Sequence, residues 1–144
     1  MIFRKAKDLL IAFLCLLVGL LIYVNSRTET FFMRFMEDWG IIDYFKFSNN
    51  EFWHNLPPLI KYQIPDMLWM LSMIVVIRVI WDYRYDFISS SFLLAAFVMG
   101  IVFEALQSVG ITPGTFDYLD ITFTLIGGFV ALYVTRDKRV RLNV

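Results

Sequence analysis

One apolar run constrains the fold more than any other feature of the sequence. Residues 9–24 read LLIAFLCLLVGLLIYV and follow a basic segment that contains Arg4, Lys5 and Lys7. The hydrocarbon core of a bilayer is about 30 Å thick and takes about 20 helical residues to cross, so this run spans it with help from its flanks. A basic segment before a short apolar run is also typical of a signal peptide. We interpret residues 9–25 as the first transmembrane helix.

Three further apolar segments follow the first. They predict transmembrane helices at residues 66–81, 89–108 and 120–135 of a single membrane domain that covers residues 1–144. The composition supports this interpretation, because 59% of the residues are hydrophobic and only 18% are charged, whereas about 25% are charged in ordinary soluble domains. The sequence therefore predicts an all-α, polytopic membrane protein built as a four-helix transmembrane bundle.

The longest polar stretch, residues 26–65, is predicted to be an outer loop. Its segment TFFMRFMEDW mixes aromatic and charged residues, which predicts a helix that lies at the membrane interface. Pro57 and Pro58 exclude a helix that continues through them. Exposed aromatic side chains also suit contact with a partner protein, and the candidates are Phe31, Phe35, Trp39 and Trp53.

The ends of the predicted spans carry polar residues with ordinary structural explanations. Asp66 follows Pro65 at the expected start of the second span, where a carboxylate favours the helix N-terminus. Arg78, near the other end of that span, is expected to snorkel to the interface, and a buried functional arginine is the alternative. The third span has three N-cap candidates, Ser89, Ser90 and Ser91.

The distribution of Lys and Arg predicts the orientation. Nine of them lie in the N-terminal segment, around the loop between spans two and three, and in the C-terminal tail, against four in the outer loop. None lies between Gly110 and Asp120. Because positive residues collect on the cytoplasmic side, both termini are expected to face the cytoplasm, and the turn between spans three and four faces out.

That turn belongs to the stretch from Gly100 to Gly128, which concentrates the polar chemistry of the chain. Glu104 and Gln107 share a face at the end of the third span, and two aspartates stand at the start of the fourth. With Asp66, the ligand-binding candidates at this outer level are Glu104, Gln107, Asp117, Asp120 and Asp66.

Neighbouring carboxylates repel one another unless a cation or hydrogen-bond donors intervene. A divalent metal, a cationic group of a ligand, or hydrogen-bond donors of the chain itself would reduce this repulsion. The sequence does not decide whether a metal is bound. Asp117 and Asp120, taken singly, are most simply explained as helix caps. Glu104 favours a functional role, because an acid inside a membrane segment is costly. Arg78 is expected near the opposite boundary, too far away to pair with it.

Other chemistry has little basis in the sequence. His54 and Cys15 are single, so no zinc site and no Ser-His-Asp or Cys-His constellation is predicted. We expect no cofactor, and the sequence favours a protein without enzymatic activity. The formal net charge of zero gives no reason to expect nucleic acid as a partner. Gly127 and Gly128 are expected to pack against a neighbouring helix.

The motif of the second half of the chain resembles that of the VanZ-like family of bacterial membrane proteins. That motif is an acid with a glutamine three residues on, then Arg-x-Phe-Asp, then an aspartate with an asparagine and a glycine further along. Gly114 and Thr124 stand here at the family's arginine and asparagine. The matching positions in this chain are Glu104, Gln107, Phe116, Asp117, Asp120 and Gly127. The resemblance implies a multi-pass protein of the bacterial cytoplasmic membrane and cell envelope.

Three functions are compatible with these features. The first is a VanZ-like envelope protein whose outward acidic pocket binds an amine-bearing or metal-bridged molecule, such as a lipid-linked precursor. The second is an accessory or structural subunit of a larger membrane complex, and the third, with the least support, is an ion or proton channel. The expected partners are the lipid bilayer together with either other membrane proteins or the envelope precursor.

Overall fold

The computed structural model describes residues 2–26, 31–41, 44, 51–112 and 116–136, and for residues 31–34 and 54 it describes only the backbone. Every regular element of these residues is a helix, which confirms the predicted all-α class. The helices are α1 (Ile2–Ser26), α2 (Phe31–Asp38), α3 (Glu51–His54), α4 (Pro58–Ile80), α5 (Phe87–Ser108) and α6 (Tyr118–Val134).

Three of these helices, α1, α4 and α5, are long and apolar enough to cross a membrane. The fourth apolar helix, α6, has 17 residues and is shorter than the other three. Large apolar side chains cover the outside of the long helices. On α5, for example, the exposed ones are Phe87, Ile88, Phe92, Leu94, Val98, Met99, Ile101, Val102 and Phe103. Such a continuous apolar surface is typical of lipid contact and rare on a soluble monomer.

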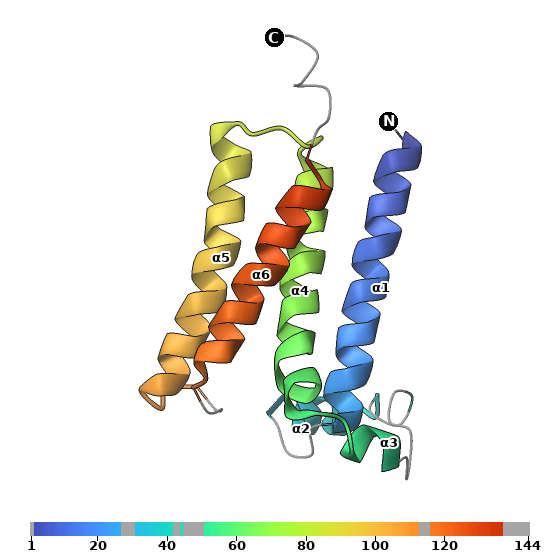
Figure 1. Cartoon of the computed structure of the whole chain (residues 1–144), viewed down its shortest axis with the longest axis vertical. Coiled ribbons are helices and arrows are strands. Elements are labelled where there is room, and N and C mark those ends of the chain that lie inside the picture. The colour runs from blue at the N-terminus through green and yellow to red at the C-terminus, as the bar shows by residue number, and fades with distance from the viewer. Residues whose placement is uncertain (1, 27–30, 42–43, 45–50, 113–115, 137–144) are drawn as a thin grey trace.

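The long helices pack around α4, which lies between α1 and α6 while α5 contacts both α4 and α6 (Figure 1). The start of α1, the end of α6 and the α4–α5 loop lie at one end, which we call the terminus end. At the opposite end, which we call the turn end, lie α2, α3, the end of α5 and the start of α6. Consecutive long helices therefore alternate in direction.

Helix α4 begins eight residues before the predicted start of the second span. Pro58 occupies the first turn, where a missing N–H costs nothing, and the amides of Ile60 and Lys61 bond to the carbonyl oxygen of Pro57. Pro65, expected to open the helix, is buried inside it. Asp66 is therefore not an N-terminal cap. The predicted cap of α5 is also wrong, because Asp86 accepts a hydrogen bond from the Ser89 amide at 2.7 Å.

Glycines allow the close approach of the helices to α4. A Cβ on Gly127 of α6 would overlap the carbonyl oxygen of Met67, so the backbones of α6 and α4 are in contact there. A Cβ on Gly128 would overlap the ring of Phe97 on α5. On the other side of α4, the ring of Trp69 lies against Gly19 of α1, where a Cβ would lie 2.8 Å from Trp69 Nε1.

Gly127→Ala is expected to lower the free energy of unfolding by about 1–3 kcal/mol, because two helix backbones must move apart to admit one methyl group. Thermal unfolding of the purified protein in detergent measures the effect. Ile126→Ala is the matched control, since Ile126 is the neighbouring residue of α6 and is exposed. A loss no larger at Gly127 than at Ile126 would show that the backbone contact does not hold α6 in place.

Candidate functional site

The candidate acids are positioned by the packing of α5 against α6. A Cβ on Gly100 of α5 would lie 2.9 Å from Thr124 Cγ2 of α6. These two residues therefore lie directly opposite each other in the α5–α6 interface. The two helices run in opposite directions, so one turn towards the turn end leads from Gly100 to Glu104 and from Thr124 to Asp120. Glu104 is only 9% exposed and Asp120 is half-buried. The two acids therefore share one level of the α5–α6 interface.

Asp66 comes from α4 at the edge of the same region. One turn above it, the tip of the Met70 side chain would lie 3.1 Å from a Cβ on Gly100, so this side of α4 faces α5. Tyr62 and Met73, on the same side of α4, are exposed, and Asp66 itself is half-buried. Asp66 thus lies near the level of Glu104 but is less buried than Glu104.

Asp117 has two roles at the start of α6. Its Oδ1 accepts the Leu119 amide at 2.9 Å, so Asp117 caps the helix as the structural alternative predicts. Its Oδ2 lies 3.3 Å from Nε2 of Gln63 on α4. Turned round, the same amide group would place its nitrogen 3.2 Å from the carbonyl oxygens of Pro58 and Leu59. The buried Gln63 side chain thus has acceptors on both sides.

The turn end therefore gathers the predicted ligand-binding candidates from three helices. Gln107 is half-buried and follows Glu104 on the same face of α5. Among the residues that the structure describes, no three His, Cys, Asp or Glu side chains are placed to hold a metal ion. Gly114, at the position of the arginine in the VanZ-like motif that the sequence resembles, lies outside the described residues. Sequence reasoning missed Gln63, although its position one turn before Met67 puts it on the face of α4 that meets α6.

The candidates for partner contact lie at this end as well. Phe35 of α2 and Trp39, in the turn directly after it, are exposed, with ring centroids 5.7 Å apart. Trp53 of α3 is half-buried against the ring of Phe52, at 5.3 Å between centroids. The side chain of Phe31 lies outside the described residues.

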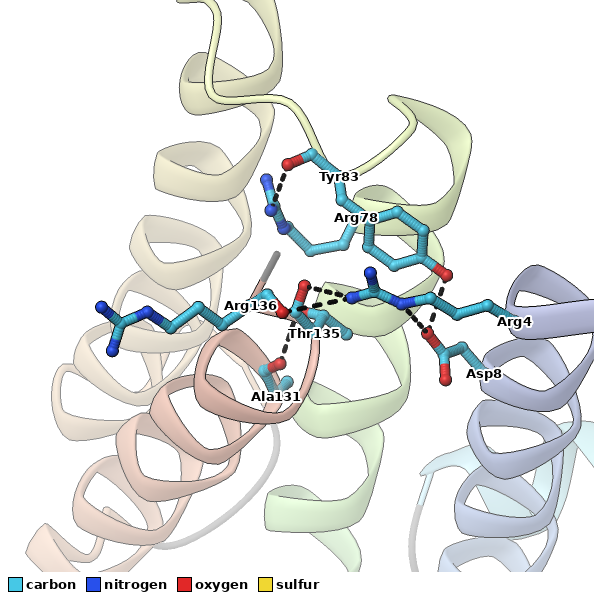
Figure 2. A network of polar contacts seen from close by, with 7 residues as sticks. All are labelled: Arg4, Asp8, Arg78, Tyr83, Ala131, Thr135 and Arg136. Carbon is cyan, nitrogen blue, oxygen red and sulfur yellow. Dashed lines mark hydrogen bonds and ion pairs between the residues drawn. The ribbon is translucent and has the colours of Figure 1, made fainter. Parts of the chain in front are cut away.

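A second polar cluster occupies the terminus end and includes Arg78 and Arg4 (Figure 2). Arg78 is 0% exposed, so the prediction that it snorkels to the interface is wrong. The α4–α5 loop folds back over it and supplies acceptors, with Nη1 donating to the Arg84 carbonyl oxygen at 2.6 Å and Nη2 donating to that of Tyr83. Its guanidinium carbon also lies 3.8 Å from the centroid of the Tyr85 ring. Arg78 and Glu104 lie at opposite ends, as expected.

Tyr83 connects this loop to α1. Asp82 and Tyr83 have φ angles of 50° and 62°, a left-handed conformation that is unfavourable for residues other than glycine and needs support from its surroundings. The Tyr83 hydroxyl donates to Asp8 Oδ2 at 2.7 Å, and Lys5 forms an ion pair with Asp82. Two residues of α1 therefore hold the reversal of the chain after α4.

Arg4 adds the end of α6 to the same cluster. Its Nη2 donates to the carbonyl oxygens of Thr135 and Arg136 at 3.1 and 3.2 Å (Figure 2). Carbonyl groups at a helix C-terminus carry partial negative charge, so a cation is favourable there. The guanidinium carbon of Arg4 lies 4.0 Å from the centroid of the Tyr83 ring, and its Nε is 3.8 Å from Asp8 Oδ2. Arg4 thus links α1, α6 and the α4–α5 loop.

This environment changes the acidity of the loop residues. Burial, and then the hydrogen bond to the Asp8 carboxylate, raise the pKa of Tyr83 from 10.0 to about 12. The hydrogen bond from Lys5 holds the pKa of Asp82 below its ordinary value. The cluster therefore keeps Tyr83 protonated and Asp82 charged.

Comparison with known proteins identifies no relative of the chain. No protein-family model matches the chain, and neither the curated proteins nor the solved structures contain a match.

Between pH 10 and 12 the free energy of unfolding is expected to fall. In this range the unfolded chain has released the Tyr83 proton while the folded chain still holds it, so stability present below pH 10 is lost as the pH rises towards 12. Tyr83→Phe should remove this contribution and flatten the decline, which denaturant unfolding over the pH range measures. Tyr118→Phe is the control, because Tyr118 is exposed. Equal declines in the two variants would contradict the buried Tyr83–Asp8 contact.

Proposed function

We propose that the chain is a VanZ-like integral membrane protein of the bacterial cell envelope that crosses the cytoplasmic membrane four times. Helix α6, with 17 residues and a length of roughly 25 Å, serves as the fourth span at the lower limit for a transmembrane helix. The arrangement of the helices supports an even number of spans, since α1 begins and α6 ends at the same end. Both termini face the cytoplasm in this proposal, and the turn end faces outward.

The proposed activity is the binding of an amine-bearing envelope molecule at the turn end. One observation carries it: Glu104 is a buried carboxylate in a membrane-length apolar helix, at the level of a second acid, Asp120. A charged group in such a position is expensive unless it serves binding or is compensated. A protonated amine supplies both the positive charge and the hydrogen-bond donors that paired carboxylates require.

The surroundings of these acids favour the same class of ligand. Gln63 presents its amide to acceptors on both sides, the Asp117 carboxylate and the carbonyl oxygens at the start of α4. The cations Arg4 and Arg78 are held at the terminus end by backbone carbonyl oxygens, far from the acids. A subunit role through the exposed rings of α2 stays a prediction.

Glu104→Gln is expected to weaken the binding of a long-chain alkylamine, such as dodecylamine, about tenfold, because a charge-assisted hydrogen bond contributes about 1.5–3 kcal/mol. Calorimetry of the full-length protein in detergent micelles measures the affinity. Asp86→Asn is the matched control, because Asp86 caps α5 at the opposite end and asparagine also caps helices. Unchanged affinity in a Glu104→Gln protein that elutes as a single species would overturn the proposal.

A further inference from the structure

The outer surface of α1 is exposed and apolar over only part of its length. Its exposed large side chains in this region are Leu9, Leu10, Phe13, Leu14, Leu16 and Val18. From Gly19 to Ser26 every residue is buried or half-buried. The apolar belt of α1 therefore stops short of the turn end, because other elements cover the last two turns of the helix.

One of the covering elements is α2. Met36 is buried in a cluster with Tyr23 and Val24 of α1, and Trp69 of α4 packs against the same cluster. The contact places α2 beside the last turns of α1, at the turn end of the molecule (Figure 1). Helix α2 thus packs against the sides of α1 and α4 through Met36.

The remaining faces of α2 differ in chemistry. At 3.6 residues per turn, successive residues are about 100° apart, so Phe35 and Trp39 lie about 40° apart. Met36 lies about 100° from Phe35 and about 60° from Trp39. Both rings are exposed, and Trp39 is 67% exposed. Glu37 points about 200° away from Phe35 and is also exposed. The helix therefore has a docked side, an aromatic face and an acidic face.

We propose that the face formed by Phe35 and Trp39 lies in the boundary between lipid headgroups and acyl chains of the leaflet at the turn end. These rings belong to the segment that covers the last turns of α1, beyond the end of its exposed apolar belt. Aromatic rings collect at this depth of a bilayer, and a helix lying there turns its charged face to water. The occupant of the aromatic face is lipid, and the inference goes beyond the proposed ligand site.

Site-directed spin labelling of the full chain tests the proposal. Cys15 is the single cysteine, so Cys15→Ala gives a background for one label at a time. Trp39→Cys tests the aromatic face and Glu37→Cys is the matched control two residues away. In phosphatidylcholine vesicles, the label at position 39 should collide more with oxygen, which concentrates in lipid, and the label at position 37 more with a water-soluble nickel chelate.

Two results would overturn the proposal. Equal access of the nickel chelate to both labels would place the aromatic face in water. A label at position 39 that is immobilised and shielded from both reagents would show that a protein, either a partner or a second copy, covers the face. Phe35→Cys repeats the test on the same face, so a folding defect of the Trp39 variant does not decide the outcome.

Discussion

The contact between the backbones of α4 and α6 at Gly127 and Met67 is the constraint on which the other features depend. Helix α4 has α1 on one side and α6 on the other, so it fixes the level of every polar group. When α6 lies this close, the Asp117 cap meets Gln63, and the end of α6 meets Arg4. A residue larger than glycine at position 127 would disturb both ends at once.

The direction of the helices gives one physical reason for the positions of the charged residues at the two ends. Helices α4 and α6 run in the same direction, so their C-termini both lie at the terminus end, where Arg4 and Arg78 bind backbone carbonyl oxygens. Their N-termini lie at the turn end with Asp117 and Asp120. Cations at helix C-termini and acids at N-termini both favour the helix dipole. For α6, whose N-terminus has Asp117 and Asp120 and whose C-terminal carbonyl oxygens bind Arg4, the charges therefore agree with the helix dipole.

Much of this arrangement could be predicted from the sequence, because apolar runs and the charges between them are local signals. The all-α class followed from the runs, and the separation of Arg78 from Glu104 followed from their positions along antiparallel helices. The start of α4 could not be predicted in the same way. Pro65 normally marks a helix boundary, but here it is buried within α4, whose packing with α1 extends around it.

Tertiary contacts explain the other differences. Arg78 was expected to reach water, yet the loop after α4 folds back and offers it two carbonyl oxygens. That fold depends on two left-handed residues held by Lys5 and Asp8, and the sequence between α4 and α5 contains no glycine to indicate such a reversal. The contact of Gln63 with Asp117 joins residues 54 positions apart, and no local pattern predicts it.

We propose that the terminus end and the turn end lie on opposite sides of a membrane crossed by four helices. Cysteine labelling with a membrane-impermeant maleimide tests it most directly, in the Cys15→Ala background in a bacterial host. Ile111→Cys, in the turn after α5, should label in intact cells, and Arg84→Cys, in the α4–α5 loop, should label only after permeabilisation. Labelling of both sites in intact cells, or of Arg84→Cys alone, would contradict the account.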